Sequence, residues 1–150
     1  MEKITSLVSR IKGHRVYLDT NSLIYFIEKN SEFFSVISPI FELIGTSEIF
    51  AYTSELTLTE ILTKPIRDKH IQVIESYTEL LFDEELITLI CTSRNTFLLA
   101  AKISAELSLR TPDAIHMASA VERECRFFIT NDKKIKSYNN TEVLYVSDFP

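Results

Sequence analysis

The sequence predicts an α/β protein: an α/β/α sandwich around a central parallel sheet of about five strands, with helices on both faces. Short apolar stretches such as 16–18 and 127–129 alternate along the chain with segments of helical periodicity, which is the order that βαβ units produce. Hydrophobic residues make up 45% of the 150 residues and charged residues 25%, values typical of globular proteins. This length suits one domain over residues 1–150.

In the first half of the chain, apolar spacing and turn residues predict the order of elements. Gly13 should end an extra N-terminal helix that packs on or beside the domain. Pro39 should interrupt a helix, which then restarts with Ser38 as its cap. The expected elements are helices over 2–12 and 20–29, an interrupted helix over 33–44, and strands over 15–18 and 49–52.

In the second half, prolines and acidic caps are the clearest boundary signals. Pro65 should close one helix, and Asp68 should cap the next. Thr111-Pro112-Asp113 has the composition of a helix N-terminus, with a capping threonine, a proline in the first turn and then an acid. The expected helices span 54–63, 68–81, 96–107 and 111–124, and the expected strands span 86–90, 126–130 and 142–146.

Composition excludes several classes of function. The formal net charge of −5 has the wrong sign for binding nucleic acid through bulk charge. Only two glycines are present, Gly13 and Gly45, so neither common Gly-rich phosphate loop fits and no nucleotide cofactor is expected. Cys91 and Cys125 lack metal-ligand spacing and fit buried thiols in a reducing compartment. The sequence shows neither a signal peptide nor a membrane span, so we expect a cytoplasmic protein.

Four acidic residues stand where functional side chains gather in a parallel sheet. Asp19 and Asp132 follow strands directly, Asp113 lies in the first turn of a helix, and Glu60 lies inside another. Four carboxylates in one pocket would repel each other, and a divalent cation removes that conflict. Mg²⁺ prefers oxygen ligands and keeps several waters, one of which it can activate as a nucleophile.

Each of these residues also has a purely structural interpretation. Asp19 could cap the helix that follows it, and Thr57 with Glu60 matches a capping box. Asp113 complements the helix macrodipole, and Asp132 is an ordinary turn residue. His116, one turn after Asp113, is more often a satisfied core histidine than a ligand. Periodicity alone does not show that the four acids meet.

The joint pattern resembles the PIN-domain ribonucleases, especially the VapC-like toxins of type II toxin–antitoxin pairs. The segments that carry the likeness occur in the family's order and lie at 18–21, 54–62, 111–120 and 128–132. The resemblance implies a metal-dependent endoribonuclease, in which a metal-activated water hydrolyses the phosphodiester bonds of RNA. It also implies one or two Mg²⁺ or Mn²⁺ ions, a homodimer and a cognate antitoxin protein that blocks the site.

By motif match, the resemblance assigns roles to residues of this chain. Asp19 and Asp113 would be direct metal ligands, and Glu60 and Asp132 would complete the acidic cluster. Thr130 would orient the metal or its water, and Asn21 would support Asp19, with Thr20, Asn131 and His116 also in supporting positions. The candidates for holding the RNA backbone are Lys64, Arg67, Lys69, Arg110, Lys133, Lys134 and Lys136.

Two alternatives remain open at this stage. A haloacid-dehalogenase-like phosphatase also places Asp at the end of strand one and uses Mg²⁺. Its nucleophile motif has a second acid two residues later, where this chain has Asn21. The other alternative is a PIN fold that binds RNA or protein without cutting it.

Overall fold

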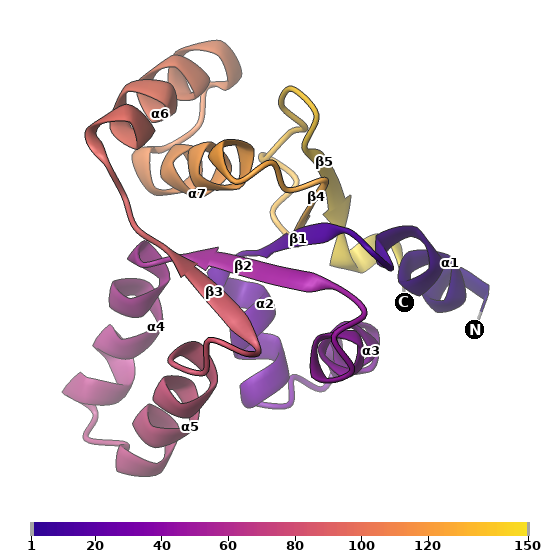
Figure 1. Cartoon of the computed structure of the whole chain (residues 1–150). Helices are drawn as coiled ribbons and strands as arrows, with labels where there is room; N and C mark the ends of the chain where they lie inside the picture. The colour runs from indigo at the N-terminus through magenta and orange to yellow at the C-terminus, as the bar shows by residue number, and fades with distance from the viewer. Residues whose placement is uncertain (1, 150) are drawn as a thin grey trace.

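The chain folds around a parallel sheet with helices on both of its faces (Figure 1). The computed structural model describes residues 2–149. Within them, five parallel strands pair in the order β3-β2-β1-β4-β5. This architecture confirms the fold class that the sequence predicts.

The elements follow one another in regular alternation. The strands are β1 (Arg15–Leu18), β2 (Phe50–Ser54), β3 (Ile87–Ile90), β4 (Phe127–Thr130) and β5 (Glu142–Tyr145). The helices are α1 (Glu2–Ile11), α2 (Thr20–Ile27), α3 (Phe34–Gly45), α4 (Leu56–Arg67), α5 (Ile71–Leu81), α6 (Arg94–Leu107) and α7 (Thr111–Glu122), followed by a 3-10 turn, η1 (Val146–Asp148).

Both faces of the sheet are buried, each under its own set of helices. In Figure 1, α6 and α7 lie on one side of the sheet and α2 to α5 lie on the other. Along β1, Val16 and Leu18 join the apolar core beneath the larger set, whereas Tyr17 joins the core beneath α6 and α7. Because successive strand side chains point to opposite faces, a strand covered on both sides is apolar without alternation.

The chain changes direction across the sheet between β1 and β4. The first half adds β2 and then β3 on one side of β1, and the chain then crosses over to place β4 and β5 on the other side. Val16 pairs with Phe127 and Leu18 with Ile129, so β1 and β4 end side by side. In open parallel sheets, ligands bind outside the carboxyl ends of the strands at such a switch point.

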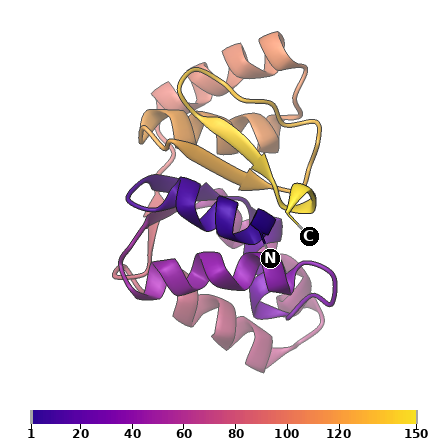
Figure 2. The ribbon, with the colours of Figure 1, turned by 90° about the vertical axis from the view of Figure 1, so that its right-hand side faces the viewer.

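The N-terminal helix α1 packs against the domain instead of extending from it. Figure 2 shows α1 beside α3 and close to the β4–β5 edge. Leu7 and Ile11 are buried in the core of the larger helix set, and Arg10 pairs with Glu142 of β5.

Two prolines do not break the helices in which the sequence predicts a break. The α3 helix runs without interruption through Pro39, although proline has no N–H to bond the carbonyl four residues earlier. That carbonyl belongs to Ser35, which is exposed and can bond water instead. Burial of Val36, Ile37 and their neighbours holds the helix together. Likewise α4 continues past a buried Pro65 to Arg67.

Three other expectations from the sequence are wrong. Asp68 ends α4 instead of capping α5, whose first residue is Ile71. The α6 helix begins two residues early because Ser93 forms a capping box with Thr96. Cys91 is exposed, although Cys125 is buried as expected. None of the helices in the described part of the chain could span a membrane.

Truncating Leu7 tests whether α1 belongs to the folded core. Leu7 is 1% exposed, so Leu7→Ala should lower the free energy of unfolding by about 2–5 kcal/mol, measured by urea denaturation. Ile71→Ala is the matched control, because Ile71 is 66% exposed and should change stability by less than about 0.5 kcal/mol. Equal stability of the two variants would show that α1 does not contribute to the core.

Candidate active site

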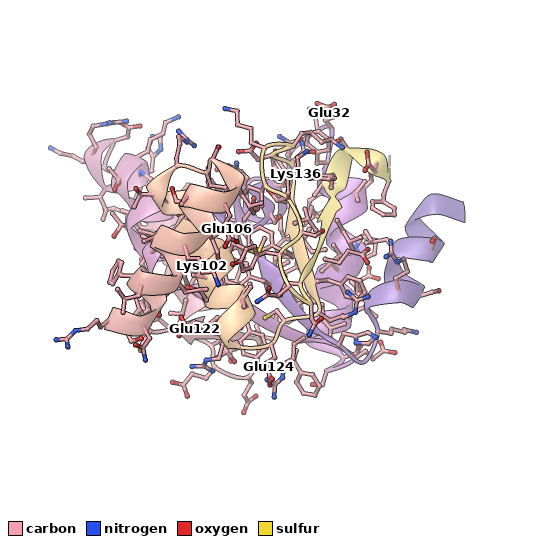
Figure 3. All side chains as sticks on the ribbon, turned by 90° about the horizontal axis from the view of Figure 1, so that it is seen from above. Glu32, Lys102, Glu106, Glu122, Glu124 and Lys136 are labelled. Carbon is pink, nitrogen blue, oxygen red and sulfur yellow. The ribbon has the colours of Figure 1, made fainter. Side chains whose placement is uncertain are left out.

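A hollow of about 240 Å³ lies at the carboxyl ends of β1 and β4. All four predicted acidic residues line it, and they come from four separate parts of the chain. This edge of the sheet can be found in Figure 3. Lys136, which follows β4, lies on the side of the carboxyl ends, and Glu124, which precedes β4, lies on the opposite side of the molecule. The lining residues are Asp19, Thr20, Asn21, Ile24, Glu60, Arg110, Asp113, His116, Asp132 and Ile135.

Asp19 is the most constrained of the four acids. Its side chain caps α2, with Oδ1 accepting hydrogen bonds from the Ser22 N–H at 2.9 Å and the Ser22 hydroxyl at 2.8 Å. Its other oxygen, Oδ2, accepts from the Thr130 hydroxyl at 2.5 Å. Burial raises the pKa of the Asp19 carboxyl above its ordinary value, and the hydrogen bonds from Thr130 and Ser22 oppose that rise without cancelling it.

Glu60 reaches the hollow from the middle of α4. Its Oε1 accepts from Thr20 Oγ1 at 2.9 Å and is bonded to His116 Nε2 at 2.5 Å. Burial alone would raise the pKa of Glu60, but the hydrogen bonds from His116 and Thr20 outweigh it and lower the pKa. Glu60 is therefore an ionised carboxylate at neutral pH. The predicted capping box with Thr57 is absent, since Thr57 bonds Thr53 instead.

His116 is bonded at both of its ring nitrogens. Nε2 meets Glu60, and Nδ1 lies 2.5 Å from the hydroxyl of Tyr17. The same hydroxyl accepts the Ser54 backbone N–H at 3.0 Å. Burial raises the pKa of Tyr17 well above its ordinary value, so the phenol is neutral.

Asp113 and Arg110 also line the hollow. Asp113 lies in the first turn of α7, and its Oδ2 is 3.5 Å from Nε of Arg110. The Asp113 side chain is 16% exposed and that of Arg110 is 75% exposed. Arg110 is the only lysine or arginine among the lining residues described above, so negative charge dominates the hollow.

Asp132 and Thr130 connect the end of β4 to Asp19. Thr130 Oγ1 accepts the Asp132 N–H at 3.1 Å while its proton goes to Asp19. Asp132 Oδ1 in turn accepts the Lys134 N–H at 2.9 Å. Asp132 therefore stabilises the turn after β4 and also lines the hollow.

Several predicted residues lie away from the hollow. Asn131 turns its amide to Ser147 and Tyr25. Lys64 lines a neighbouring pocket that shares Ile24 and Glu60 with the hollow. The remaining lysines and arginines predicted to hold RNA are exposed on the surface, and two pair with acids: Arg67 with Asp68, and Lys133 with Asp148.

The donor set suits a hard divalent cation, although the carboxylates are not gathered around one point. Oxygen ligands of like charge around a hollow are what Mg²⁺ and similar ions prefer. Among the described side chains, residues 6–149, however, no three His, Cys, Asp or Glu form a group arranged to hold a metal ion. Both oxygens of Asp19 and one oxygen of Glu60 are instead bonded to protein donors. A cation held by three of these side chains would require at least one of them to move toward the others.

The sequence of this chain matches the model of a known protein family. The model for the PIN domain matches residues 16–140. This chain belongs to the PIN-domain family. The match begins at β1, so α1 lies outside it, and it includes all four acids that line the hollow of this PIN domain.

Three solved structures with a similar fold are toxin–antitoxin complexes. A Rickettsia felis VapBC2 complex bound to a promoter DNA fragment contains a chain with TM-score 0.69 and 18% identity, covering 87% of this chain and 98% of that one. DNA-bound VapBC from Salmonella typhimurium gives 0.64 and 19%, covering 89% and 98%. A Klebsiella pneumoniae toxin–antitoxin complex gives 0.61 and 19%, covering 84% and 94%. No curated protein sequence matches the chain.

Sequence reasoning missed two residues that hold the site together. Ser22 bonds Asp19 twice, and its position three residues after a capping Asp was a usable signal. Tyr17 lies on the face of β1 that α6 and α7 cover, and a tyrosine buried in a doubly covered strand needs a partner for its hydroxyl. No single-sequence signal identifies that partner as His116.

The raised pKa of Asp19 predicts how its replacement affects stability. The folded state favours the protonated acid, so the stability it contributes is present below the unfolded pKa and is lost as pH rises through the folded pKa. In metal-free buffer at pH 7, Asp19→Asn should therefore be more stable than the original protein. The difference should shrink toward about pH 4, measured by urea denaturation.

Glu48→Gln provides a control of opposite sign. The Thr46 hydroxyl and Lys12 hold the pKa of Glu48 below its ordinary value, so its contribution is present at neutral pH and lost as pH falls. Glu48→Gln should be slightly less stable than the original protein at pH 7. A less stable Asp19→Asn variant at pH 7 would contradict the electrostatic interpretation of Asp19.

Proposed function

We propose that this PIN-domain protein is a divalent-metal-dependent endoribonuclease and the toxin of a toxin–antitoxin pair. The observation that carries the proposal is the convergence of Asp19, Glu60, Asp113 and Asp132 on one hollow at the switch point of the sheet. Family membership supports a nuclease, and the likeness to chains of toxin–antitoxin complexes supports a cognate antitoxin as partner.

The acids would hold one or two Mg²⁺ or Mn²⁺ ions. When bound, such an ion lowers the pKa of a coordinated water and neutralises charge on the phosphate oxygens. Asp19 has one fixed orientation because Ser22 and Thr130 bond its two oxygens. Asp113 and Asp132 reach the hollow from α7 and from the turn after β4. The products would carry 5′-phosphate and 3′-hydroxyl ends.

Arg110 would contact the RNA backbone at the rim of this acidic hollow. Its Nε lies 3.5 Å from Asp113 and its side chain is 75% exposed, so guanidinium N–H groups that face solvent can bond a phosphate. Lys133, Lys134 and Lys136 follow Asp132 at the same edge of the sheet and would extend this contact. The protein would act in the cytoplasm as a homodimer, for which Phe97 and Leu98 on α6 offer exposed apolar surface.

Cleavage of RNA by the purified protein tests the proposal directly. Labelled total RNA should be cut with Mg²⁺ or Mn²⁺ and not with chelator. Asp113→Asn should reduce cutting by more than about 100-fold, because Asp113 would bind the metal directly. Replacing a residue that only supports a metal ligand typically costs about 10- to 100-fold. Asp83→Asn, an exposed acid before β3, is the matched control and should cut normally. RNA binding without cleavage under all these conditions would instead indicate a non-catalytic RNA-binding module.

The role of Arg110 predicts a specific change in salt dependence. Arg110→Gln should weaken RNA binding in chelator and reduce the slope of log affinity against log salt concentration by about 1, measured by fluorescence anisotropy. Lys102→Gln is the control, because Lys102 of α6, labelled in Figure 3, is exposed and does not line the hollow. If both variants bind alike, Arg110 makes no phosphate contact.

A further inference from the structure

A chain of hydrogen bonds runs from the buried sheet to Glu60 and is not used by the proposed reaction. It starts at the Ser54 backbone N–H, which donates to the Tyr17 hydroxyl at 3.0 Å. The hydroxyl lies 2.5 Å from Nδ1 of His116, and Nε2 lies 2.5 Å from Oε1 of Glu60. Tyr17 is fully buried and His116 is 4% exposed, so water does not offer easy alternative partners.

Satisfying every donor and acceptor fixes where the protons lie. The Tyr17 oxygen accepts from Ser54, and its own proton needs an acceptor. In the described part of the chain, the Tyr17 hydroxyl is hydrogen-bonded to the Ser54 N–H, which is a donor, and to Nδ1 of His116, so Nδ1 is the acceptor for the Tyr17 proton. With Nδ1 as acceptor, the neutral imidazole carries its proton on Nε2 and donates it to Glu60. The opposite tautomer would place a ring lone pair against a carboxylate.

This tautomer determines which Glu60 oxygen is free. Oε1 receives both the His116 N–H and the Thr20 hydroxyl. From the side chains of residues 6–149, no hydrogen bond or ion pair occupies Oε2, and the Glu60 side chain is 33% exposed beside the hollow. Two donors on one oxygen hold the carboxylate plane, so the second oxygen remains available to a ligand in the hollow.

We infer that Tyr17 is a positioning residue that acts through His116 to orient Glu60 for cation binding. This inference rests on the proposed function, because it assigns Glu60 a ligand in that same hollow. The tyrosine touches neither substrate nor cation. Its hydroxyl selects the Nε2–H tautomer of the imidazole, and the imidazole then holds Glu60. Replacing a residue that supports a metal ligand in this way typically lowers metal affinity or activity by about 10- to 100-fold.

The first experiment measures the tautomer directly, without any nuclease assay. Imidazole ¹⁵N–¹H correlation spectra of the metal-free full chain should show His116 protonated on Nε2 only. Loss of the signal in His116→Asn assigns it among the three histidines of the chain. Protonation on Nδ1, or on both nitrogens, in the original protein at pH 7 would overturn the inference.

The second experiment measures Mn²⁺ affinity by calorimetry. Tyr17→Phe should disturb the tautomer signal and weaken Mn²⁺ binding by about tenfold. Tyr77→Phe is the matched control, since it removes another buried hydroxyl, bonded to Glu28 at 2.7 Å, and should change neither. Unaltered tautomer and affinity in a folded Tyr17→Phe protein would also overturn the inference.

A double variant separates positioning from general loss of packing. If Tyr17 acts only through His116, then Tyr17→Phe combined with His116→Asn should bind Mn²⁺ no more weakly than His116→Asn alone. Fully additive losses would contradict the inference. If the original protein shows the expected tautomer and Mn²⁺ response but cuts no RNA, the proposed nuclease activity fails and the positioning role stands.

Discussion

The pairing of β1 with β4 is the interaction on which the candidate site depends. It sets the register in which Leu18 lies opposite Ile129, so that Asp19 and Thr130 leave neighbouring strands at the same height and bond each other. The Asp19 N–H also donates to the carbonyl of Ile129 at 3.2 Å. A slip of one residue would move every side chain of one strand to the opposite face of the sheet. Asp19 and Thr130 would then be separated, and the core side chains of that strand would leave the core in which they pack.

Burial and charge oppose each other at this point. Asp19 is 7% exposed, and a carboxylate removed from water is stabilised only by donors or a cation. Three protein donors occupy it, and its pKa is still raised. The structure therefore keeps a carboxylate whose charge remains incompletely compensated, next to three more acids and one arginine. This uncompensated negative charge destabilises the fold unless a bound cation neutralises it.

Sequence patterns predicted the fold and the lining acids well because both follow from local rules. Apolar periodicity located each strand within about two residues, and the rule for strand ends placed Asp19 and Asp132 at one edge. Two of the failures came from tertiary packing. Burial of Val36 and Ile37 kept a helix intact through Pro39. The bond between Tyr17 and His116 joins residues 99 positions apart, and no periodicity encodes such a contact.

Structural and functional interpretations of these residues are not alternatives in this molecule. Asp19 caps α2 and also lines the hollow, and Asp132 closes a turn while facing the same space. A cap fixes one carboxylate oxygen on the backbone, which removes rotamer freedom before any ligand arrives. Glu60 obtains the same restraint from side chains, because Thr20 and His116 share Oε1. The ordinary devices that end helices and turns thus orient the carboxylates of the hollow, so less side-chain entropy remains to be lost when a ligand binds.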